Sequence, residues 1–142
     1  MKTRYLRDEI ATEKLGEELA QLTPRGGTWL LRGELGAGKT TWARGFAVGL
    51  GSSGEDVASP TYAVLHRYET PRGKLFHLDL YRLGETGAWT LGLEEQVTAD
   101  DFLVVEWAGS KGPWPTDWVA TLSLETLGEG RQASWTLGAV SK

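Results

Sequence analysis

The stretch that decides the fold is Gly33-Glu34-Leu35-Gly36-Ala37-Gly38-Lys39-Thr40. It fits G-x-x-x-x-G-K-[ST], the phosphate-binding P-loop. Glycines let the backbone turn tightly and bring its N–H groups against phosphate oxygens. A helix that begins at this loop directs unpaired N–H groups and the positive end of its dipole at the same anion. Lys39 adds a mobile positive charge for the β- and γ-phosphates, and the Thr40 hydroxyl is a suitable Mg²⁺ ligand.

Residues on both sides of the motif predict the strand–loop–helix order that a P-loop requires. Residues 28–32 form a short apolar, β-prone run, as a buried strand would. Residues 41–50 then show helical spacing, which places Trp42, Phe46 and Leu50 on one side. The competing interpretation is a glycine-rich turn with an incidental lysine, and that interpretation does not account for the order.

The size and composition of the chain favour one domain. Its 142 residues fit a single domain over 1–142, and no apolar run approaches the roughly 18 residues of a membrane span. The formal net charge of −4 does not suggest nucleic-acid binding, and no DNA partner is expected. The absence of cysteine excludes disulfides, thiolate metal sites and cysteine nucleophiles. Since the N-terminus also lacks the apolar core of a secretory signal, we expect a soluble, cytoplasmic protein.

An amphipathic helix is predicted near the N-terminus, over residues 12–22. Leu15, Leu19 and Leu22 recur there at helical spacing. Thr12 can cap the start of this helix. The short segment before it is expected to be an edge strand or an irregular arm.

A β-hairpin is predicted over residues 63–81, with its turn at 71–73. One face of the return strand, the predicted core face, carries Phe76, Leu78 and Leu80. The other face carries Leu75, His77, Asp79 and Tyr81. Two ionisable groups on one face, in a strand after a P-loop helix, suggest a functional role. The alternative is that this face is simply exposed to solvent.

Residues 102–107 resemble a Walker B strand. The apolar run from Phe102 to Val105 precedes Glu106, so a buried parallel strand would deliver this carboxylate at its C-terminal end. A generic buried strand that ends in glutamate would look the same. With a P-loop upstream, Glu106 is predicted to serve a Mg²⁺ site. The alternating pattern over residues 118–139 predicts a C-terminal hairpin, in which no catalytic constellation is evident.

In their order and spacing, these motifs resemble one family. The matching segments are Gly33 to Thr41, Ser59-Pro60-Thr61-Tyr62, His77-Leu78-Asp79-Leu80-Tyr81-Arg82 and Glu106-Trp107. Because S-P-T-[FY] and H-x-D-x-Y-R accompany the P-loop, the chain is identified as a member of the bacterial tRNA threonylcarbamoyladenosine biosynthesis ATPase family, also called TsaE or YjeE. The resemblance covers the chain from about residue 8 to residue 107. It implies an α/β, P-loop NTPase-like three-layer fold with a mostly parallel central sheet plus antiparallel hairpins.

The resemblance also implies a function. Such a protein would be a small ATPase that supports formation of threonylcarbamoyladenosine at position 37 of tRNA. Its cofactors would be ATP and Mg²⁺. Its partner would be a transferase heterodimer of TsaD and TsaB, with tRNA involved only indirectly. ATP binding and hydrolysis would reset that complex between turnovers, and a site completed by the partner would leave the isolated protein a slow ATPase.

Residue roles follow from the same resemblance. Nucleotide binding is assigned to Thr12, Glu34, Leu35, Gly36, Ala37, Gly38, Lys39, Thr40, Thr41 and Trp107. The catalytic candidates are Lys39, Thr61, Asp79 and Glu106, and the Mg²⁺ candidates are Thr40, Asp79 and Glu106. Thr61 would lie in a switch-like loop near the γ-phosphate. The sequence leaves open which of Asp79, Glu106 and Thr61 binds the metal and which orients the attacking water.

Two other functions use the same P-loop. A small kinase would need an acceptor pocket and a lid that carries arginines, and the chain has little room for either. A nucleotide-dependent binding module would bind ATP with little turnover. A GTPase is disfavoured because the chain has no N-K-x-D signature.

Two further expectations concern the surroundings of the site. Trp42 and Trp107 are both expected to lie near the bound nucleotide. Residues 108–115 are rich in glycine and proline where family members commonly carry an acidic or polar segment, which leaves partner contacts through this loop open.

Overall fold

The computed structural model describes residues 1–34, 36–54, 65–80, 92–107 and 112–138. Several predicted features fall outside these ranges, namely Leu35, the segment from Ser59 to Tyr62, Tyr81 and Arg82. The elements in chain order are β1 (Lys2–Leu6), α1 (Glu9–Gln21), β2 (Thr28–Arg32), α2 (Lys39–Gly49), β3 (Leu65–Thr70), β4 (Gly73–Asp79), α4 (Leu93–Gln96), β5 (Phe102–Glu106), β6 (Val119–Leu127) and β7 (Gly130–Thr136). None of the helices in these ranges is long and apolar enough to cross a membrane.

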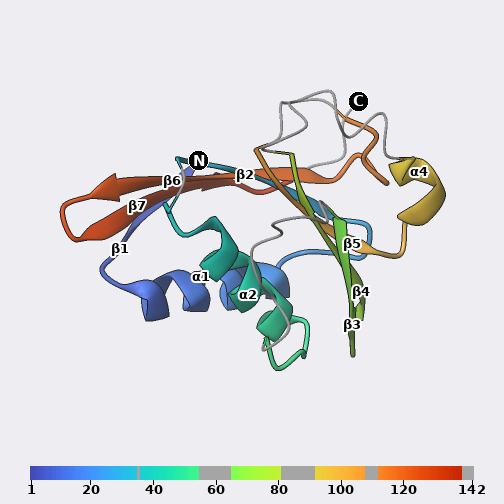
Figure 1. Cartoon of the computed structure of the whole chain (residues 1–142), viewed down its shortest axis with the longest axis horizontal. Helices are drawn as coiled ribbons and strands as arrows, with labels where there is room; N and C mark the ends of the chain where they lie inside the picture. Colours follow the sequence, from blue (N-terminus) through green and yellow to red (C-terminus); the bar gives the residue numbers. More distant parts are fainter. Residues whose placement is uncertain (35, 55–64, 81–91, 108–111, 139–142) are drawn as a thin grey trace.

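The seven strands within the described ranges join one sheet, in the order β1-β7-β6-β2-β5-β4-β3. The four central strands β6, β2, β5 and β4 run parallel, and the outer pairs are antiparallel. Helices α1 and α2 lie together on one side of the sheet (Figure 1). The predicted α/β class is therefore confirmed, with the parallel part at the centre of the sheet. The C-terminal hairpin is part of the central sheet, because its strand β6 pairs in parallel with β2.

The parallel centre of the sheet forms because its strands are apolar on both faces. Every residue of β5 is buried, as are the first four residues of β2. Alternate residues point to opposite faces. Trp29 and Val104 therefore face the helices, while Leu30 and Val105 belong to the core on the other side. Strands buried on both faces have near-continuous apolar runs, as these two do.

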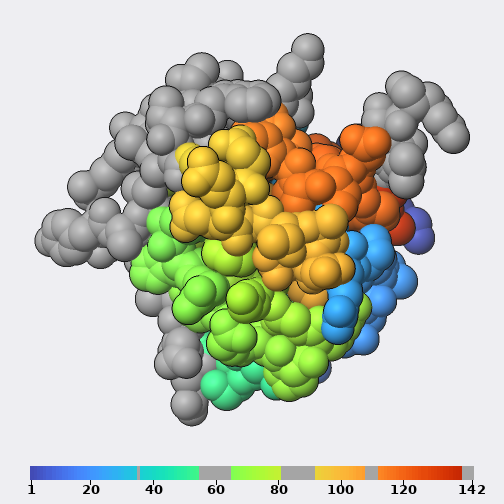
Figure 2. All heavy atoms as spheres, turned by 90° about the vertical axis from the view of Figure 1, so that its right-hand side faces the viewer, coloured from blue at the N-terminus to red at the C-terminus, as the bar shows by residue number. Residues whose placement is uncertain are grey.

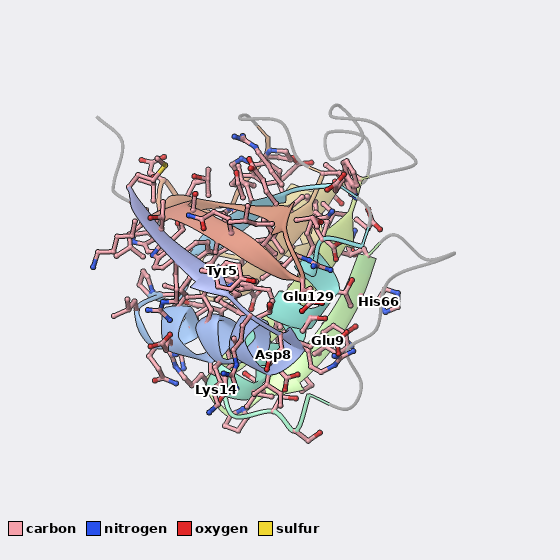
Figure 3. The ribbon with its side chains drawn as sticks, turned by 90° about the vertical axis from the view of Figure 1, so that its left-hand side faces the viewer. Tyr5, Asp8, Glu9, Lys14, His66 and Glu129 are labelled. Atoms are coloured by element: carbon pink, nitrogen blue, oxygen red, sulfur yellow. The ribbon has the colours of Figure 1, made fainter. Side chains whose placement is uncertain are left out.

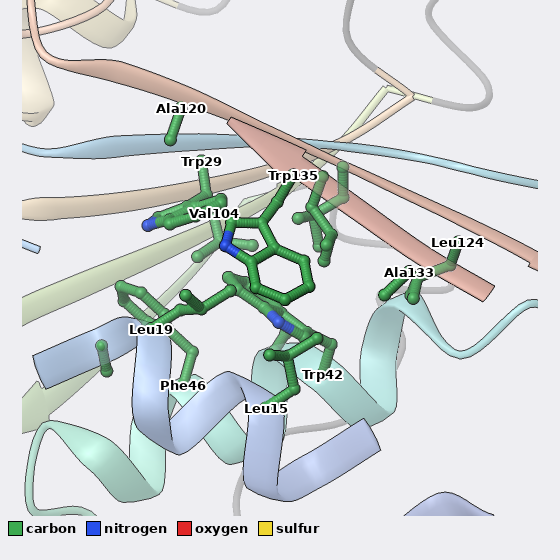
Figure 4. Close-up of a cluster of buried hydrophobic side chains, with 14 of the residues drawn as sticks. Leu15, Leu19, Trp29, Trp42, Phe46, Val104, Ala120, Leu124, Ala133 and Trp135 are labelled. Carbon is green, nitrogen blue, oxygen red and sulfur yellow. The ribbon is translucent and has the colours of Figure 1, made fainter. Parts of the chain in front are cut away.

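Aromatic rings fill the space between the helices and the sheet (Figure 4). Trp42 stacks on Phe46 with ring centroids 5.2 Å apart, and its ring lies 5.3 Å from that of Trp29. Trp42 is fully buried in this core. The expectation that Trp42 lies at the nucleotide site is therefore wrong, because its position on α2 turns the side chain toward the sheet.

Helix α1 begins earlier than predicted. Its N-cap is Asp8, whose carboxylate accepts a hydrogen bond of 2.8 Å from the N–H of Ala11. Thr12 lies one turn into the helix, and its hydroxyl donates to the carbonyl of Asp8, so the prediction that Thr12 caps the helix is wrong. Leu22 is the C-cap and is 58% exposed, so it does not belong to the apolar face with Leu15 and Leu19.

Glycines allow α1 and α2 to approach closely. A Cβ atom on Gly45 would lie 1.9 Å from the carbonyl oxygen of Glu13, and one on Gly16 would lie 2.3 Å from that of Trp42. No side chain fits at such distances. This contact fixes the helix that follows the P-loop against the N-terminal helix.

The opposite face of the sheet is also covered. A second core of buried residues there includes Leu78 of β4 and Leu80 just after that strand, with Leu93 and Val97 from α4 and its C-cap. Figure 2 shows α4 and its neighbours (yellow) packed beside the β3–β4 hairpin (green). His77 lies on the face of the sheet that helices α1 and α2 cover, and it is buried as well. The face that carries His77 is therefore not exposed to solvent, and the core is not confined to the Phe76 face.

Candidate functional site

The loop between β2 and α2 has the backbone of an anion-binding turn. Gly33, Gly36 and Gly38 have positive φ angles of 144°, 79° and 104°, which other residues rarely adopt. Gly38 is the N-cap of α2 and provides no side-chain cap. The first N–H groups of α2 are therefore open to an external acceptor.

Three neighbouring parallel strands end at this loop. The P-loop follows β2, Glu106 ends β5, and Asp79 ends β4. Asp79 and Glu106 are register partners, and Glu106 also pairs with Leu31 of β2. The parallel topology therefore places both acidic residues at the same end of the sheet as the glycine-rich loop. Ligands of open α/β sheets bind at this end, beyond the carboxyl ends of the strands.

Lys39 is bound by neutral groups of the protein. Its ammonium donates hydrogen bonds of 2.6 Å and 2.9 Å to the carbonyls of Gly33 and Glu34. The same nitrogen lies 4.1 Å from the centre of the Trp107 ring. Burial lowers the pKa of the Lys39 ammonium, although the carboxylates of Glu106, Asp79 and Glu34 oppose that shift. A phosphate oxygen can replace the carbonyls and would bind the ammonium more strongly.

The Glu106 carboxylate connects the P-loop helix with β4. Its Oε2 atom lies 3.4 Å from the Thr40 hydroxyl and 2.5 Å from Nε2 of His77. Hydroxyl and carboxylate oxygens are hard ligands of the kind that Mg²⁺ prefers. In the described part of the chain, no three acidic or histidine side chains form a metal cluster.

Trp107 has an unusual backbone. Its φ of 66° is the only positive value at a non-glycine residue within the described ranges. Its N–H donates to the carbonyl of Leu31, and the carbonyl of Glu106 accepts a bond from Leu80. Such left-handed residues carry strain and cluster at functional sites. Here the turn places the indole ring beside Lys39.

These groups border one cavity of about 640 Å³, a size that suits a small-molecule ligand. The start of α1 and the turn between β6 and β7 form its far wall, where Figure 3 shows Asp8, Glu9 and Glu129. The lining residues are Leu6, Arg7, Asp8, Glu9, Thr12, Gly36, Gly38, Lys39, Thr40, Thr41, Asp79, Glu106, Trp107, Glu129, Gly130 and Arg131.

Most of the predicted site residues therefore lie around the same cavity. Those that line the cavity are Thr12, Gly36, Gly38, Lys39, Thr40, Thr41, Asp79, Glu106 and Trp107. Glu34 and Ala37 contribute carbonyl oxygens to the loop instead. Leu35 and Thr61 lie outside the described residues. The roles of all these residues toward nucleotide and metal stay predictions.

Sequence reasoning missed the contribution of the C-terminal hairpin. Arg131 of β7 donates from Nε to the carbonyl of Ala37 at 3.1 Å and from Nη2 to that of Gly36 at 2.9 Å. Its third bond, from Nη1, reaches the carbonyl of Gly130 at 3.0 Å. The hairpin is thus part of the site. A lone arginine after a turn offers no sequence signal for contact with a loop 94 residues earlier.

A glycine-rich loop between a parallel strand and a helix, with acidic side chains at the ends of the next two strands, defines a protein with the P-loop NTPase-like fold. The structure is similar to the crystal structure of YdiB from Bacillus subtilis, with a TM-score of 0.75 and 25% sequence identity. That likeness covers 97% of this chain and 86% of YdiB.

Sequence comparisons define the family. The model of the threonylcarbamoyl adenosine biosynthesis protein TsaE matches residues 6–133. The TsaE protein of Synechocystis is 41% identical over an alignment of 107 residues, and the match covers 72% of this chain and 68% of that protein. The TsaE protein of Aquifex aeolicus is 36% identical over 93% of this chain and 92% of its own length. The chain therefore belongs to the TsaE family and has a role in threonylcarbamoyladenosine biosynthesis.

The family match is longer than the motifs suggested. The motif resemblance ends near residue 107, whereas the family model continues through β6 and into β7, to residue 133. The matched region thus includes Arg131 and the far wall of the cavity.

Proposed function

We propose that this TsaE chain binds ATP with Mg²⁺ and hydrolyses it to support the formation of N6-threonylcarbamoyladenosine in tRNA by a TsaD–TsaB transferase heterodimer. The observation that carries the proposal is the meeting of Lys39, Thr40 and Glu106 around one cavity. These three groups supply the cation, the hydroxyl and the carboxylate that P-loop phosphoryl transfer uses. In this proposal tRNA is met only through the partner.

Phosphate binding is proposed for the loop from Gly36 to Thr40. The positive φ angles of Gly36 and Gly38 and the uncapped start of α2 support this assignment. Lys39 would exchange the carbonyls of Gly33 and Glu34 for phosphate oxygens, since a charge-assisted bond to an anion is stronger than one to a neutral carbonyl. The nucleoside would occupy the part of the cavity between α1 and the β6–β7 turn, where Thr12 lies.

Thr40 and Glu106 are proposed to hold Mg²⁺. Their oxygens lie 3.4 Å apart, close to the spacing of about 3 Å between neighbouring ligands of an octahedral ion with bonds of 2.0–2.1 Å. When bound, Mg²⁺ would neutralise charge on the phosphates. Asp79 borders the same cavity from β4 and is the proposed acceptor that orients the attacking water. Thr61, outside the described residues, stays a candidate for the same step.

Hydrolysis would form a bond between the water oxygen and the γ-phosphorus and break the bond to the oxygen that bridges the β- and γ-phosphates. The cavity offers few cations for this charge. Its cationic side chains in the described ranges are Arg7, Lys39 and Arg131. Arg131 uses its N–H groups on loop carbonyls, and Arg7 lies beside Asp8. We therefore expect slow turnover in the absence of the partner.

The small number of cationic side chains that the described residues place around the cavity favours a second candidate, a nucleotide-dependent binding module. A site in which Lys39 is the one cation available to the phosphates can bind ATP without appreciable turnover. The presence of bound ATP would then govern assembly with the heterodimer, without hydrolysis. This candidate shares every phosphate contact with the ATPase and differs only in the role of Asp79.

The test is phosphate release from ATP with and without the TsaD–TsaB heterodimer. We expect stimulation by the heterodimer and loss of release in Lys39→Ala and Glu106→Ala. Transfer of labelled phosphate to a small acceptor would replace the ATPase with a kinase. Binding of ATP without turnover, even with heterodimer and tRNA present, would establish the binding module.

A further inference from the structure

His77 is a buried imidazole that the proposed reaction does not use. Its side chain is 1% exposed and lies on β4, two residues before Asp79. Its Nε2 atom is 2.5 Å from Oε2 of Glu106, whose side chain is 5% exposed. A buried polar pair of this kind is costly unless its members bind each other well.

The sheet places these two side chains on one face. Glu106 pairs with Asp79, and His77 pairs with Val104, in the parallel ladder between β4 and β5. Because side chains alternate along a strand, residues two apart share a face. His77 and Glu106 are therefore diagonal neighbours across the ladder, at a spacing that long side chains can bridge.

The chemistry of the pair fixes the direction of the hydrogen bond. An ionised carboxylate can only accept, so the proton of a neutral His77 must be on Nε2. The Thr40 hydroxyl reaches the same oxygen, Oε2, from α2. Both hydrogen bonds of the carboxylate within the described residues therefore meet on one oxygen, Oε2, of a residue that borders the cavity.

The other ring nitrogen argues against a purely structural role. Nδ1 of His77 is buried and has no hydrogen-bond partner among the described residues. An aliphatic side chain at this place would avoid that unpaired polar atom. Packing alone therefore does not explain an imidazole here, whereas the bond to Glu106 does.

We propose that His77 is a positioning residue: its Nε2–H holds one oxygen of Glu106 and so orients the carboxylate for Mg²⁺ beside the Thr40 hydroxyl. This inference rests on the proposed function. Partners that orient a metal ligand are general in metal sites, and their loss typically weakens metal binding by roughly 10- to 100-fold. His77 itself would touch neither the metal nor the nucleotide.

The test compares two amides of similar polarity. The amide nitrogen of Gln reaches about as far as Nε2 of histidine, while that of Asn reaches only as far as Nδ1. His77→Gln therefore keeps a donor for Glu106, and His77→Asn and His77→Leu remove it. The matched controls are His66→Gln, His66→Asn and His66→Leu, because His66 is the register partner of His77 on β3 and does not line the cavity.

The measured quantity is the Mg²⁺ concentration that gives half of the metal-dependent gain in affinity for a fluorescent ADP analogue. Affinity is also measured in EDTA, where the metal makes no contribution. We expect His77→Asn and His77→Leu to raise the half-saturating Mg²⁺ concentration roughly 10-fold or more. Affinity in EDTA, His77→Gln and all three His66 variants should stay within about two-fold of wild type.

Two results would overturn the proposal. One is a wild-type Mg²⁺ dependence in folded His77→Asn. The other is a His77→Gln protein as impaired as His77→Asn, since a donor at the Nε2 position would then be irrelevant. If His77→Leu does not fold, the comparison of Gln with Asn decides alone. If the nucleotide affinity of the wild-type protein did not depend on the Mg²⁺ concentration, the proposed function itself would be overturned.

Discussion

The guanidinium of Arg131 donates a hydrogen bond of 3.1 Å to the carbonyl of Ala37 and so joins the last strand of the sheet to the phosphate loop. A second bond reaches the carbonyl of Gly36. In a trans peptide group, the C=O and the N–H of the next residue point in opposite directions. A loop carbonyl that is held by Arg131 therefore directs the following N–H away from Arg131. Arg131 thereby stabilises the positive-φ conformation of the loop, and these loop carbonyls occupy its N–H groups.

Replacing Arg131 by Ala should weaken nucleotide binding. The loss of hydrogen bonds from a charged group, about 1.5 kcal/mol net, corresponds to roughly 10-fold in the dissociation constant for ADP. Titration calorimetry measures this change. Arg67→Ala is the control, because Arg67 is an exposed arginine on β3. Equal affinities of Arg131→Ala and wild type would show that the loop holds its shape alone.

The contrast between Lys39 and Arg131 shows what the sequence can predict. Lys39 belongs to a motif in which a strand, a loop and a helix are contiguous, so local sequence is enough to place it at the end of β2. Glu106 follows from the same logic, since a short apolar run that ends in an acid reads as a parallel strand. Arg131 reaches the site only because β6 pairs with β2, and nothing in its neighbourhood predicts that pairing.

Burial and capping also depend on more than local pattern. His77 is buried because helices cover that face of the sheet, although alternation along β4 alone leaves the face open to either environment. Asp8 and Thr12 are both good capping residues, and both precede the periodic leucines. The contact of Leu6 with the core sets where the chain turns into α1, and that turn makes Asp8 the cap.

Asp8→Ala should therefore destabilise the protein. It removes the carboxylate that accepts from the N–H of Ala11, and loss of an N-cap costs about 1 kcal/mol. Urea denaturation followed by circular dichroism measures the change in the free energy of unfolding. Asp117→Ala is the matched control, because Asp117 is exposed and outside any helix. A smaller loss in Asp8→Ala than in Asp117→Ala would contradict the assignment of the cap.

Trp107 should report nucleotide binding through its fluorescence. Its ring lies 4.1 Å from the Lys39 ammonium, and a phosphate that draws Lys39 away would change the environment of the indole. We expect a fluorescence change on titration with ADP that disappears in Trp107→Phe. Trp118→Phe, a half-buried tryptophan that does not line the cavity, should retain the signal. A full signal in Trp107→Phe would mean that another tryptophan, rather than Trp107, reports the nucleotide.

Lys39→Met should stabilise the protein without nucleotide while abolishing nucleotide binding. Burial lowers the pKa of Lys39 below its ordinary value of 10.5, so the unfolded chain binds this proton more tightly than the folded one. Wild type therefore loses stability as the pH falls from 10.5 through the folded pKa, and the penalty is complete once the pH lies below that folded pKa. Methionine keeps most of the aliphatic chain and carries no charge.

Thermal denaturation at two pH values distinguishes this cause from a simple packing change. Lys39→Met should have a higher Tm than wild type at pH 7, and the advantage should shrink as the pH approaches 10.5. Lys74→Met, at an exposed lysine on β4, should show no such trend. If the advantage is absent at pH 7, the two carbonyls and the Trp107 ring compensate the buried charge fully. A gain that does not depend on pH would assign the effect to packing.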